Sequence, residues 1–457
     1  MIRADLQRAA RWTDGVLRGT DASFEGVSTD TRTLQPGRLF IALRGPNFDA
    51  HDRIADAVTG GAAGAVVDRE VECTLPTIMV ADTRHALGAL AGAWRLEFDI
   101  PLIAVTGSNG KTTTKEMVAT ILAQAGPALA TTGNLNNDIG LPLTLLALAP
   151  EHRHAVVEMG ANHPGEIANL CRIARPTISV ITNAARAHLE GFGSIESVAR
   201  AKGEIIAGLA EGGTAIINAD DPYVGLWREL AREHRLLTFG LSDNADIRAT
   251  QIQSRWDEEG GATRFELHAK HGEVPVALRF VGRHMVINAL AAAAAGLAAG
   301  LDLGTVADGL AAARPVAGRL RLLRPVPGLI VVDDCYNANP DSVAAALDVL
   351  AEMPGERWFV FADLLEIGAD GERLHREVGE RARSRGVTRL LTVGSAARNA
   401  SAAFGGEHFD DLDALMGALS LPADREVTVL VKGSNAMGLS RVVQMLQGTA
   451  PLAAEVG

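Results

Sequence analysis

Short apolar runs alternate with longer stretches of helical spacing between residues 101 and 313. Each run is followed by polar residues, and we predict four strands there, at residues 102–105, 155–157, 178–181 and 215–217. Strands and helices that alternate in this way are typical of a largely parallel sheet with helices on its faces. Because ligands of such sheets bind beyond the carboxyl ends of the strands, the polar residues that follow them are candidate site residues.

The segments on either side show related patterns. The first hundred residues predict a small mixed α/β module that ends in a helix capped by Asp82, with strands at residues 39–43, 65–67 and 78–80. The last third predicts a doubly wound, Rossmann-like sheet, with strands at residues 330–332, 359–361, 390–393 and 429–431. The fold class is therefore α/β, with predicted domains at 1–98, 99–313 and 314–457.

Two stretches of the central segment depart from this alternation. Residues 247–278 alternate between apolar and polar positions and predict a β excursion. Residues 285–301 are rich in Ala and Gly and contain Asn288, so they are too weakly hydrophobic for a membrane span. We interpret them as a buried helix.

Length and charge narrow the class of protein. The 457 residues correspond to roughly three domains at about 150 residues each. Asp and Glu (55) outnumber Lys and Arg (43), and the net charge of −12 argues against nucleic acid or an anionic membrane as a partner. The three cysteines are unclustered and the first residues lack the apolar run of a secretory signal. We expect a monomeric protein of the cytoplasm.

The strongest chemical motif follows the first predicted strand of the central segment. It reads TGSNGKTTT at residues 106–114 and opens a predicted helix, which is the context of a phosphate-binding loop. In such a loop, backbone amides surround the phosphates, a lysine neutralises them and a hydroxyl reaches Mg2+. The residues in these roles are Gly107, Ser108, Asn109, Gly110, Lys111, Thr112 and Thr113. Val105 replaces the first glycine of the longer consensus, and the alternative is a glycine-rich turn that binds nothing.

Further polar residues become candidate site residues only in combination with this loop. Glu158 ends a predicted strand and is either a metal ligand or water-orienting carboxylate, or else a helix cap or solvated group. Taken alone, His188 is typical of a structural histidine and Lys202 of a solvated lysine on a helix. Residues 131–146 read TTGNLNNDIGLPLTLL and predict either a loop of ligand donors or a capped turn before a helix.

Together these motifs resemble the Mur ligase family. The resemblance covers nearly the whole chain in matching order and rests on TGSNGKTTTKEM, TTGNLNNDIGLPLTLL, VVEMGANHPGEI, AHLEGFGSIESVARAKGEI, GRHMVINALAA, PVAGRL, VDDCYNANPDS and LLEIGADGERLHREVG. It implies the three-domain architecture of that family. The small N-terminal α/β domain would bind a UDP-sugar, the central domain would be a P-loop ATPase-like parallel sheet, and the C-terminal domain would be Rossmann-like.

The resemblance also implies an activity. Mur ligases form C–N bonds for peptidoglycan synthesis with ATP, through an acyl phosphate. Within the family, the chain is most similar to members that join D-alanyl-D-alanine to UDP-N-acetylmuramoyl-tripeptide, with ATP and Mg2+ as cofactors. The DNPR motif of the members that add a diamino acid does not occur in this sequence. Nucleotide contacts from two domains further imply that ATP closes the C-terminal domain onto the central one.

Roles of individual residues follow from the resemblance. The implied catalytic residues are Lys111, Glu158, His188 and Lys202, and the implied Mg2+ residues are Thr112, Glu158, His188 and Lys202. Lys202 matches a lysine that is carbamylated, so it should lie where a neutral amine is favoured. The implied contacts to ATP, beyond the phosphate loop, are Asn288, Arg319, Asp334, Tyr336 and Asn337. The implied contacts to the UDP-substrate are Ser28, Thr31 and Arg32.

Two other functions stay open at this point. One is a ligase like folylpolyglutamate synthetase, which shares the compact phosphate loop but has no obvious need for the N-terminal module. The other is a non-catalytic scaffold that binds ATP. One departure from the family is Asn435 in KGSNAMGLSRVV, where many relatives have arginine.

Overall fold

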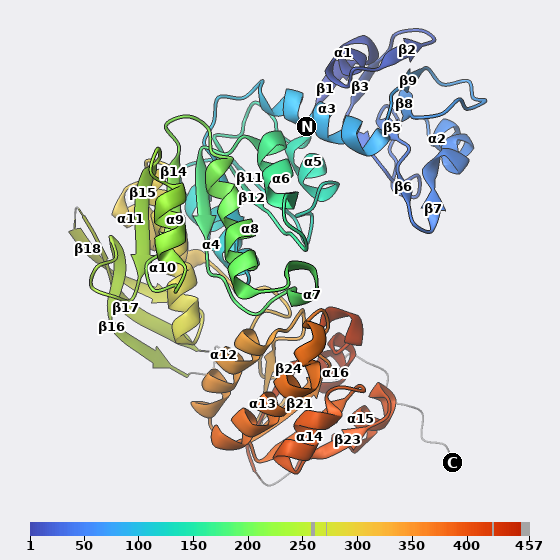
Figure 1. Ribbon diagram of the computed structural model, residues 1–457. Coiled ribbons are helices and arrows are strands. Elements are labelled where there is room, and N and C mark those ends of the chain that lie inside the picture. Colours follow the sequence, from blue (N-terminus) through green and yellow to red (C-terminus); the bar gives the residue numbers. More distant parts are fainter. Residues whose placement is uncertain (257–260, 271, 423–424, 449–457) are drawn as a thin grey trace.

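The computed structural model describes residues 1–256, 261–270, 272–422 and 425–448. The chain forms three α/β units in sequence order, and both outer units attach to the central one (Figure 1). None of the described helices combines the length and the apolar character that crossing a membrane requires.

The N-terminal unit contains a mixed five-stranded sheet. In spatial order its strands are β2 (Val16–Arg18), β9 (Thr77–Met79), β8 (Gly64–Val67), β5 (Leu39–Ile41) and β4 (Val27–Ser28). Only the β2–β9 pair is antiparallel. Two small antiparallel pairs flank it, β1 (Arg3–Asp5) with β3 (Ser23–Glu25) and β6 (Arg44–Gly45) with β7 (Phe48–Asp49). The helices are α1 (Leu6–Trp12), η1 (Ala50–Arg53), α2 (Ile54–Thr59) and α3 (Thr83–Arg95).

Helix α3 joins the N-terminal unit to the central one. Asp82 caps it, as predicted, by accepting a hydrogen bond from the His85 amide at 2.6 Å. Its buried Leu87 and Leu90 belong to one hydrophobic core together with residues of the central unit. Trp94 donates from Nε1 to the Leu148 carbonyl at 3.1 Å.

The central unit is built on a nine-stranded sheet. In spatial order its strands are β11 (Ala128–Ala130), β12 (His154–Glu158), β10 (Leu102–Thr106), β13 (Ile178–Ile181), β14 (Thr214–Asn218), β15 (Arg235–Gly240), β16 (Ile247–Arg255), β17 (Ala262–Ala269) and β18 (Gly272–Leu278). Strands β11 to β16 run parallel, and the last three form the antiparallel excursion that the alternating pattern predicts.

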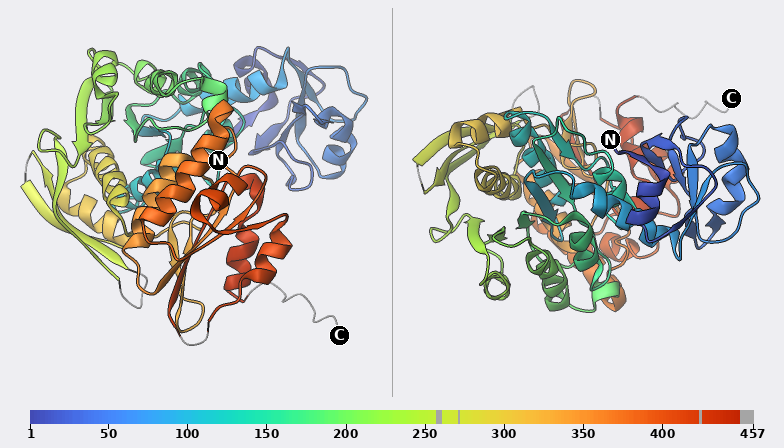
Figure 2. Two further views of the ribbon diagram at one scale, coloured as in Figure 1. Left: turned by 60° about the horizontal axis from the view of Figure 1, so that its bottom comes forward. Right: turned by 90° about the horizontal axis from the view of Figure 1, so that it is seen from above.

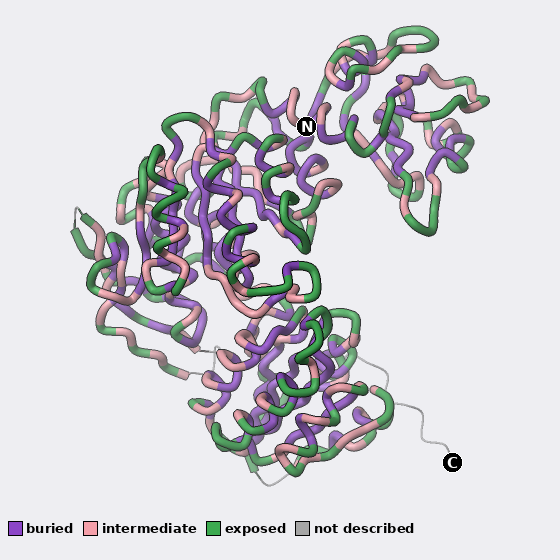
Figure 3. Tube along the Cα trace, viewed as in Figure 1, coloured by how far each residue is buried: buried purple, intermediate pink, exposed green. Residues whose placement is uncertain are grey.

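Both faces of the parallel part are covered by helices, and the central strands β10 and β13 are buried along their whole length (Figure 3). Successive side chains alternate between the faces: Ile103 and Val105 join one core cluster, Leu102 and Ala104 another. Helices α4 (Lys111–Ala123), α10 (Arg283–Ala298) and α11 (Leu303–Ala312) pack in the first cluster. The other helices are α5 (Gly140–Leu145), α6 (Glu166–Ala174), α7 (Leu189–Phe192), α8 (Ile195–Ala207) and α9 (Val224–Leu230). Helix α10 confirms the predicted buried helix.

The C-terminal unit has a six-stranded sheet, parallel except for its first strand (Figure 2). In spatial order the strands are β19 (Arg321–Leu323), β20 (Leu329–Asp333), β24 (Val427–Lys432), β21 (Glu356–Ala362), β22 (Arg389–Val393) and β23 (Glu407–Phe409). The helices are α12 (Pro340–Ala351), η2 (Gly368–Asp370), α13 (Gly371–Ser384), α14 (Arg398–Phe404), α15 (Leu412–Ala418), η3 (Asn435–Met437) and α16 (Ser440–Leu446). The predicted α/β class with parallel sheets is confirmed.

Candidate active site

A cleft of about 1240 Å³ lies where the central and C-terminal units meet. The phosphate loop, the Asn-rich loop before α5 and the segment after β13 line it from the central unit. From the C-terminal unit, residues after β20, β21 and β24 line it. Since these positions are carboxyl ends of parallel strands in two sheets, the cleft lies where the topology favours a ligand site.

The backbone of the phosphate loop requires glycine at two positions. Gly107 has φ +145° and Gly110 has φ +80°, a region that L side chains rarely adopt. A Cβ atom at Gly107 would overlap the Thr182 hydroxyl, and one at Gly110 would overlap the Asn288 side chain. Asn288, on α10, therefore lies directly against the loop, where its predicted nucleotide contact would require it.

We expect Gly110→Ala to lower nucleotide affinity by about tenfold and stability by about 1–2 kcal/mol, because alanine is strained at this φ and displaces Asn288. Calorimetric titration with ADP and thermal unfolding measure the two effects. Gly212→Ala is the matched control: Gly212 has φ +70°, and a Cβ atom there would meet nothing within 4 Å. An unchanged ADP affinity in Gly110→Ala would contradict the role of the loop.

Two of the loop amides donate hydrogen bonds within the protein. Ser108 N donates to the Asn183 carbonyl and Asn109 N to Asn183 Oδ1, both at 3.0 Å. These bonds fix the loop to the segment after β13. The amides at the start of α4, from Gly110 onward, are the ones placed to meet an anion.

Lys111 begins α4 and lies in the cleft. Its Nζ donates to the carbonyls of Gly107 at 2.6 Å and Ser108 at 3.2 Å. Burial lowers the pKa of Lys111, while the nearby Glu158 carboxylate acts in the opposite direction. The ammonium is thus held above the loop where phosphates would lie.

Glu158 and Thr112 fit a cation near this loop. Glu158 ends β12 and is only 2% exposed; its Oε1 accepts a hydrogen bond from Asn136 Nδ2 at 2.8 Å. Its Oε2 is buried and has no hydrogen-bond partner. A carboxylate oxygen left in this state needs a proton or a cation, so the donor set suits Mg2+. The Thr112 hydroxyl accepts from Arg319 Nη2 at 3.2 Å.

His188 lines the cleft close to Lys111 and Lys202, whose positive charges both act on it. His188 has φ +53°, and its Nδ1 lies 2.5 Å from Glu366 Oε2 of the C-terminal unit. Burial is the largest cause that lowers the pKa of His188, and Lys111 adds to it. Within the described chain, no three His, Cys, Asp or Glu residues form a ready metal cluster. The predicted metal set therefore relies on Thr112 and a modified Lys202 besides Glu158 and His188.

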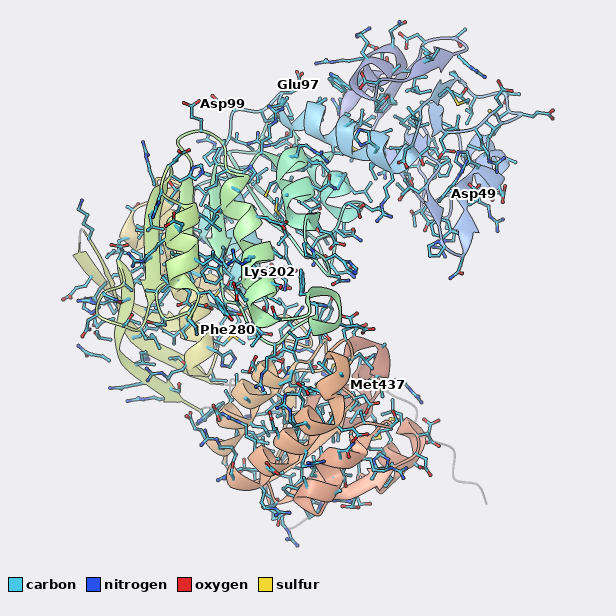
Figure 4. The ribbon with its side chains drawn as sticks, viewed as in Figure 1. Asp49, Glu97, Asp99, Lys202, Phe280 and Met437 are labelled. Atoms are coloured by element: carbon cyan, nitrogen blue, oxygen red, sulfur yellow. The ribbon has the colours of Figure 1, made fainter. Side chains whose placement is uncertain are left out.

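Lys202, labelled in Figure 4, lies on α8, is 1% exposed and is not among the described residues that line the cleft. Its Nζ is 5.4 Å from the centre of the Phe192 ring. Burial in this apolar site, together with repulsion from Lys111, lowers the pKa of Lys202 to about 7. This shift has the direction that the expected neutral amine requires, and both the neutral amine and its carbamylation stay predictions.

The predicted nucleotide residues of the C-terminal unit form a connected group. The Arg319 guanidinium lies 4.0 Å above the Tyr336 ring. Asp334 accepts from the Leu320 amide at 3.1 Å and from Lys432 Nζ at 2.5 Å. Lys432 also donates to the Asn337 carbonyl at 3.1 Å.

Asn435 supports this group from the first position of η3. Its Nδ2 donates to the Tyr336 carbonyl at 2.9 Å, and both residues line the cleft. The Asn435 amide thus helps to hold the backbone of Tyr336 in place.

The structure does not bring Ser28, Thr31 and Arg32 to the cleft. Ser28 is buried at the end of β4 and donates to the Asp30 carbonyl at 2.9 Å. Arg32 is exposed and pairs with Asp30 at 2.6 Å, which keeps the pKa of Asp30 low, at about 2. A UDP-substrate bound to these residues would therefore have to reach across to the cleft.

Among the described residues of the N-terminal unit, only Arg84 lines the cleft. No sequence motif singles it out. It lies in the first turn of α3 and pairs with Asp138 of the Asn-rich loop at 2.5 Å. Glu366, which also lines the cleft, lies in a motif of the family resemblance but was given no role of its own. Asn183 and Lys432 follow predicted strands, so the sequence marks their positions as candidates, but it does not reveal their partners, which lie far along the chain.

Comparison with known proteins decides the family. The profile of the Mur ligase middle domain matches residues 105–296, and that of the Mur ligase glutamate ligase domain matches residues 318–435. The UDP-N-acetylmuramoyl-tripeptide–D-alanyl-D-alanine ligase of Escherichia coli strain K12 is 45% identical over 451 residues, which cover 98% of this chain and 99% of that protein. The chain belongs to the Mur ligase family.

Solved structures of Mur ligases have the same architecture. A crystal structure of MurF from Acinetobacter baumannii superposes with a TM-score of 0.91 at 35% identity and covers 97% of this chain and 98% of that one. MurF ligase from Thermotoga maritima, solved in complex with ADP, superposes with a TM-score of 0.81 at 28% identity and covers 93% of this chain and 97% of that one. The predicted family and three-domain fold are confirmed.

Proposed function

We propose that this Mur ligase joins D-alanyl-D-alanine to the terminal carboxylate of UDP-N-acetylmuramoyl-tripeptide, with ATP as the second substrate. The observation that carries the proposal is the 45% identity to the Escherichia coli ligase of that name over nearly the full length of both chains. The cleft supports it, because it combines a phosphate loop, a buried carboxylate and residues of a second unit.

The reaction needs two steps that this site can support. A carboxylate oxygen of the tripeptide attacks the γ-phosphorus of ATP, and the bond from that phosphorus to ADP breaks, which gives an acyl phosphate. The amine of D-alanyl-D-alanine then attacks the acyl carbon, loses a proton, and phosphate leaves with the oxygen that the carboxylate supplied. Lys111 and the amides at the start of α4 offset the repulsion between the two anions of the first step.

Mg2+, when bound, would neutralise phosphate charge. Thr112 and Glu158 would hold one ion, and His188 with a carbamylated Lys202 would hold a second. Asn136 orients Glu158 by binding its Oε1, which leaves Oε2 directed to a cation. To test this assignment, Mg2+ is titrated into wild type and Glu158→Gln, and the nucleotide affinity of each protein is measured along the titration.

The C-terminal unit would complete the nucleotide site and exclude water. Arg319 contacts Thr112 of the phosphate loop, and Asn109 of that loop exchanges hydrogen bonds with Asn339, at 2.7 and 3.4 Å. Asn339 is also the N-cap of α12. An acyl phosphate formed between the two units would thereby be shielded from hydrolysis. We place this reaction in the cytoplasm.

The UDP part of the substrate would bind the N-terminal unit at Ser28, Thr31 and Arg32. We expect Arg32→Ala to raise KM for the UDP-tripeptide by about tenfold and to leave KM for ATP unchanged, because one charge-assisted contact is lost. Steady-state kinetics with each substrate varied in turn measures both. Arg3→Ala is the control, since Arg3 is an exposed arginine of the same unit in a similar pair with Glu25. An equal rise in both KM values would count against the assignment.

The activity itself is tested by supplying purified protein with ATP, Mg2+ and competing substrate pairs. We expect phosphate release and a pentapeptide product with UDP-N-acetylmuramoyl-tripeptide and D-alanyl-D-alanine. Dihydrofolate with glutamate should give neither. Activity with the folate pair alone, or nucleotide binding without any product, would replace this proposal by one of its two competitors.

A further inference from the structure

Residues 183–188, here called the connector segment, link three parts of the molecule. The segment follows β13, and three successive amides donate to different partners. Ala184 N bonds to Asp221 Oδ2 at 2.9 Å, and Ala185 N bonds to Ser108 Oγ of the phosphate loop at 2.9 Å. The next amide, Arg186 N, bonds to Asp341 Oδ2 of the C-terminal unit at 2.8 Å. The connector segment thus joins the phosphate loop to the C-terminal unit.

The side chain of Arg186 also contacts the C-terminal unit. Its guanidinium donates twice to Asp341 Oδ1, from Nε at 3.0 Å and from Nη2 at 2.6 Å. Its Nη1 donates to Glu377 Oε2 at 3.2 Å. Asp341 lies in the first turn of α12 and Glu377 lies on α13. One arginine therefore binds two helices of the neighbouring unit.

The same segment ends at His188, which faces the cleft. His188 has a left-handed backbone, and such a conformation persists only where its surroundings hold it. Glu366 of the C-terminal unit holds it from the far side, through the imidazole and through a hydrogen bond from the Glu190 amide to the Glu366 carbonyl at 3.3 Å. Contacts with the C-terminal unit thus fix the segment on both sides of His188.

Arg186 itself is not among the residues that line the cleft in the described part of the chain. Its hydrogen bonds go to protein groups of the other unit, so it has no direct route to the reacting atoms. Any effect on the reaction has to pass through the segment that it holds.

We propose that Arg186 is a positioning residue that places His188 in the cleft when the C-terminal unit is docked. The Arg186–Asp341 pair fixes the backbone two residues before His188, so docking of the C-terminal unit and placement of the imidazole become one event. The catalytic part of this inference rests on the proposed function.

The side chains of Arg186, Asp341 and Glu377 are 31%, 36% and 42% exposed. An ordinary ion pair at such exposure contributes little to the free energy of unfolding. The geometry differs from such a pair in one respect. Both oxygens of Asp341 are used, one by the guanidinium and one by the backbone amide, which also fixes the direction of the loop. The expected effect is therefore on placement and rate rather than on global stability.

The test compares Arg186→Ala, Asp341→Asn and the double variant with wild type. We expect kcat to fall by about tenfold in each single variant and no further in the double variant, because the two residues act as a unit. KM for the UDP-tripeptide should not change. Arg373→Ala is the matched control, because Arg373 also contacts Glu377 but only within the C-terminal unit, and it should keep the wild-type kcat.

A second readout needs no turnover. Small-angle scattering with a non-hydrolysable ATP analogue and Mg2+ should give a larger radius of gyration for Arg186→Ala than for wild type and Arg373→Ala. Arg186→Lys keeps the charge and should lie between the two, which covers the case in which alanine impairs folding. A wild-type radius and kcat in Arg186→Ala, or multiplicative losses in the double variant, would overturn the proposal. A wild-type protein without ligase activity would instead refute the proposed function, and the scattering comparison would still test the docking role.

Discussion

Replacement of Lys111 by alanine is expected to lower kcat for ligation by about a thousandfold, because the transferred phosphoryl group then lacks the cation of the phosphate loop. The wild-type ammonium lies over the loop and is bonded to the carbonyls of Gly107 and Ser108. Removal of the side chain opens these carbonyls to water in the cleft, so the fold should survive. The loss should appear in the rate of phosphate release at saturating ATP.

The control for Lys111 is Lys270→Ala, an exposed lysine on the turn between β17 and β18. It changes the net charge equally and should keep the wild-type rate. Thermal unfolding of both variants separates a loss of chemistry from a loss of fold. A Lys111→Ala enzyme within about tenfold of wild type would mean that the loop does not carry phosphoryl transfer.

Lys202→Ala is expected to have an equally large effect, a loss of about a thousandfold in kcat that acetate or formate partly restores. A carbamate forms when the neutral amine adds to CO2 and releases a proton, and the site favours that amine. Burial lowers the pKa of Lys202 to about 7, so the neutral form predominates above this pH and disappears below it. Carbamylation, and with it kcat, should therefore increase between about pH 6 and pH 8.

Two measurements check the role of Lys202. Protein equilibrated with carbon-13-labelled bicarbonate should show a carbamate resonance that Lys202→Ala lacks. Lys202→Arg should remain inactive with or without acetate, since it leaves a cation where an anion is needed. Full activity of Lys202→Ala without any added carboxylate would show that the residue has only a packing role beside Phe192.

The central strands could be predicted because both faces of the parallel sheet are buried, which makes β10, β12, β13 and β14 continuous apolar runs. Short and partly exposed strands such as β2, β19 and β23 escaped prediction. These strands lie at sheet edges, where pairing rather than burial defines them, and little hydrophobic signal remains.

For the site, features that depend on neighbouring residues could be predicted, and contacts between distant residues could not. The phosphate loop could be predicted because its glycines, lysine and threonines all lie within residues 106–114 and its conformation depends on them. The positions of Asn183 and Lys432 at strand ends could be predicted, but their partners could not, because these lie 74 and 98 positions away. Arg186 belongs to this second group, since its partner Asp341 is 155 positions away. The roles of Ser28, Thr31 and Arg32 remain predictions, because these residues lie outside the cleft.

The most direct measurement of the central claim follows one oxygen atom through the reaction. UDP-N-acetylmuramoyl-tripeptide labelled with oxygen-18 in its terminal carboxylate is incubated with the enzyme, ATP, Mg2+ and D-alanyl-D-alanine, and both products are analysed by mass. We expect pentapeptide together with inorganic phosphate that carries one labelled oxygen, because the acyl phosphate transfers it. Pentapeptide with unlabelled phosphate, or labelled substrate returned unchanged while ATP is hydrolysed, would contradict ligation through an acyl phosphate in this cleft.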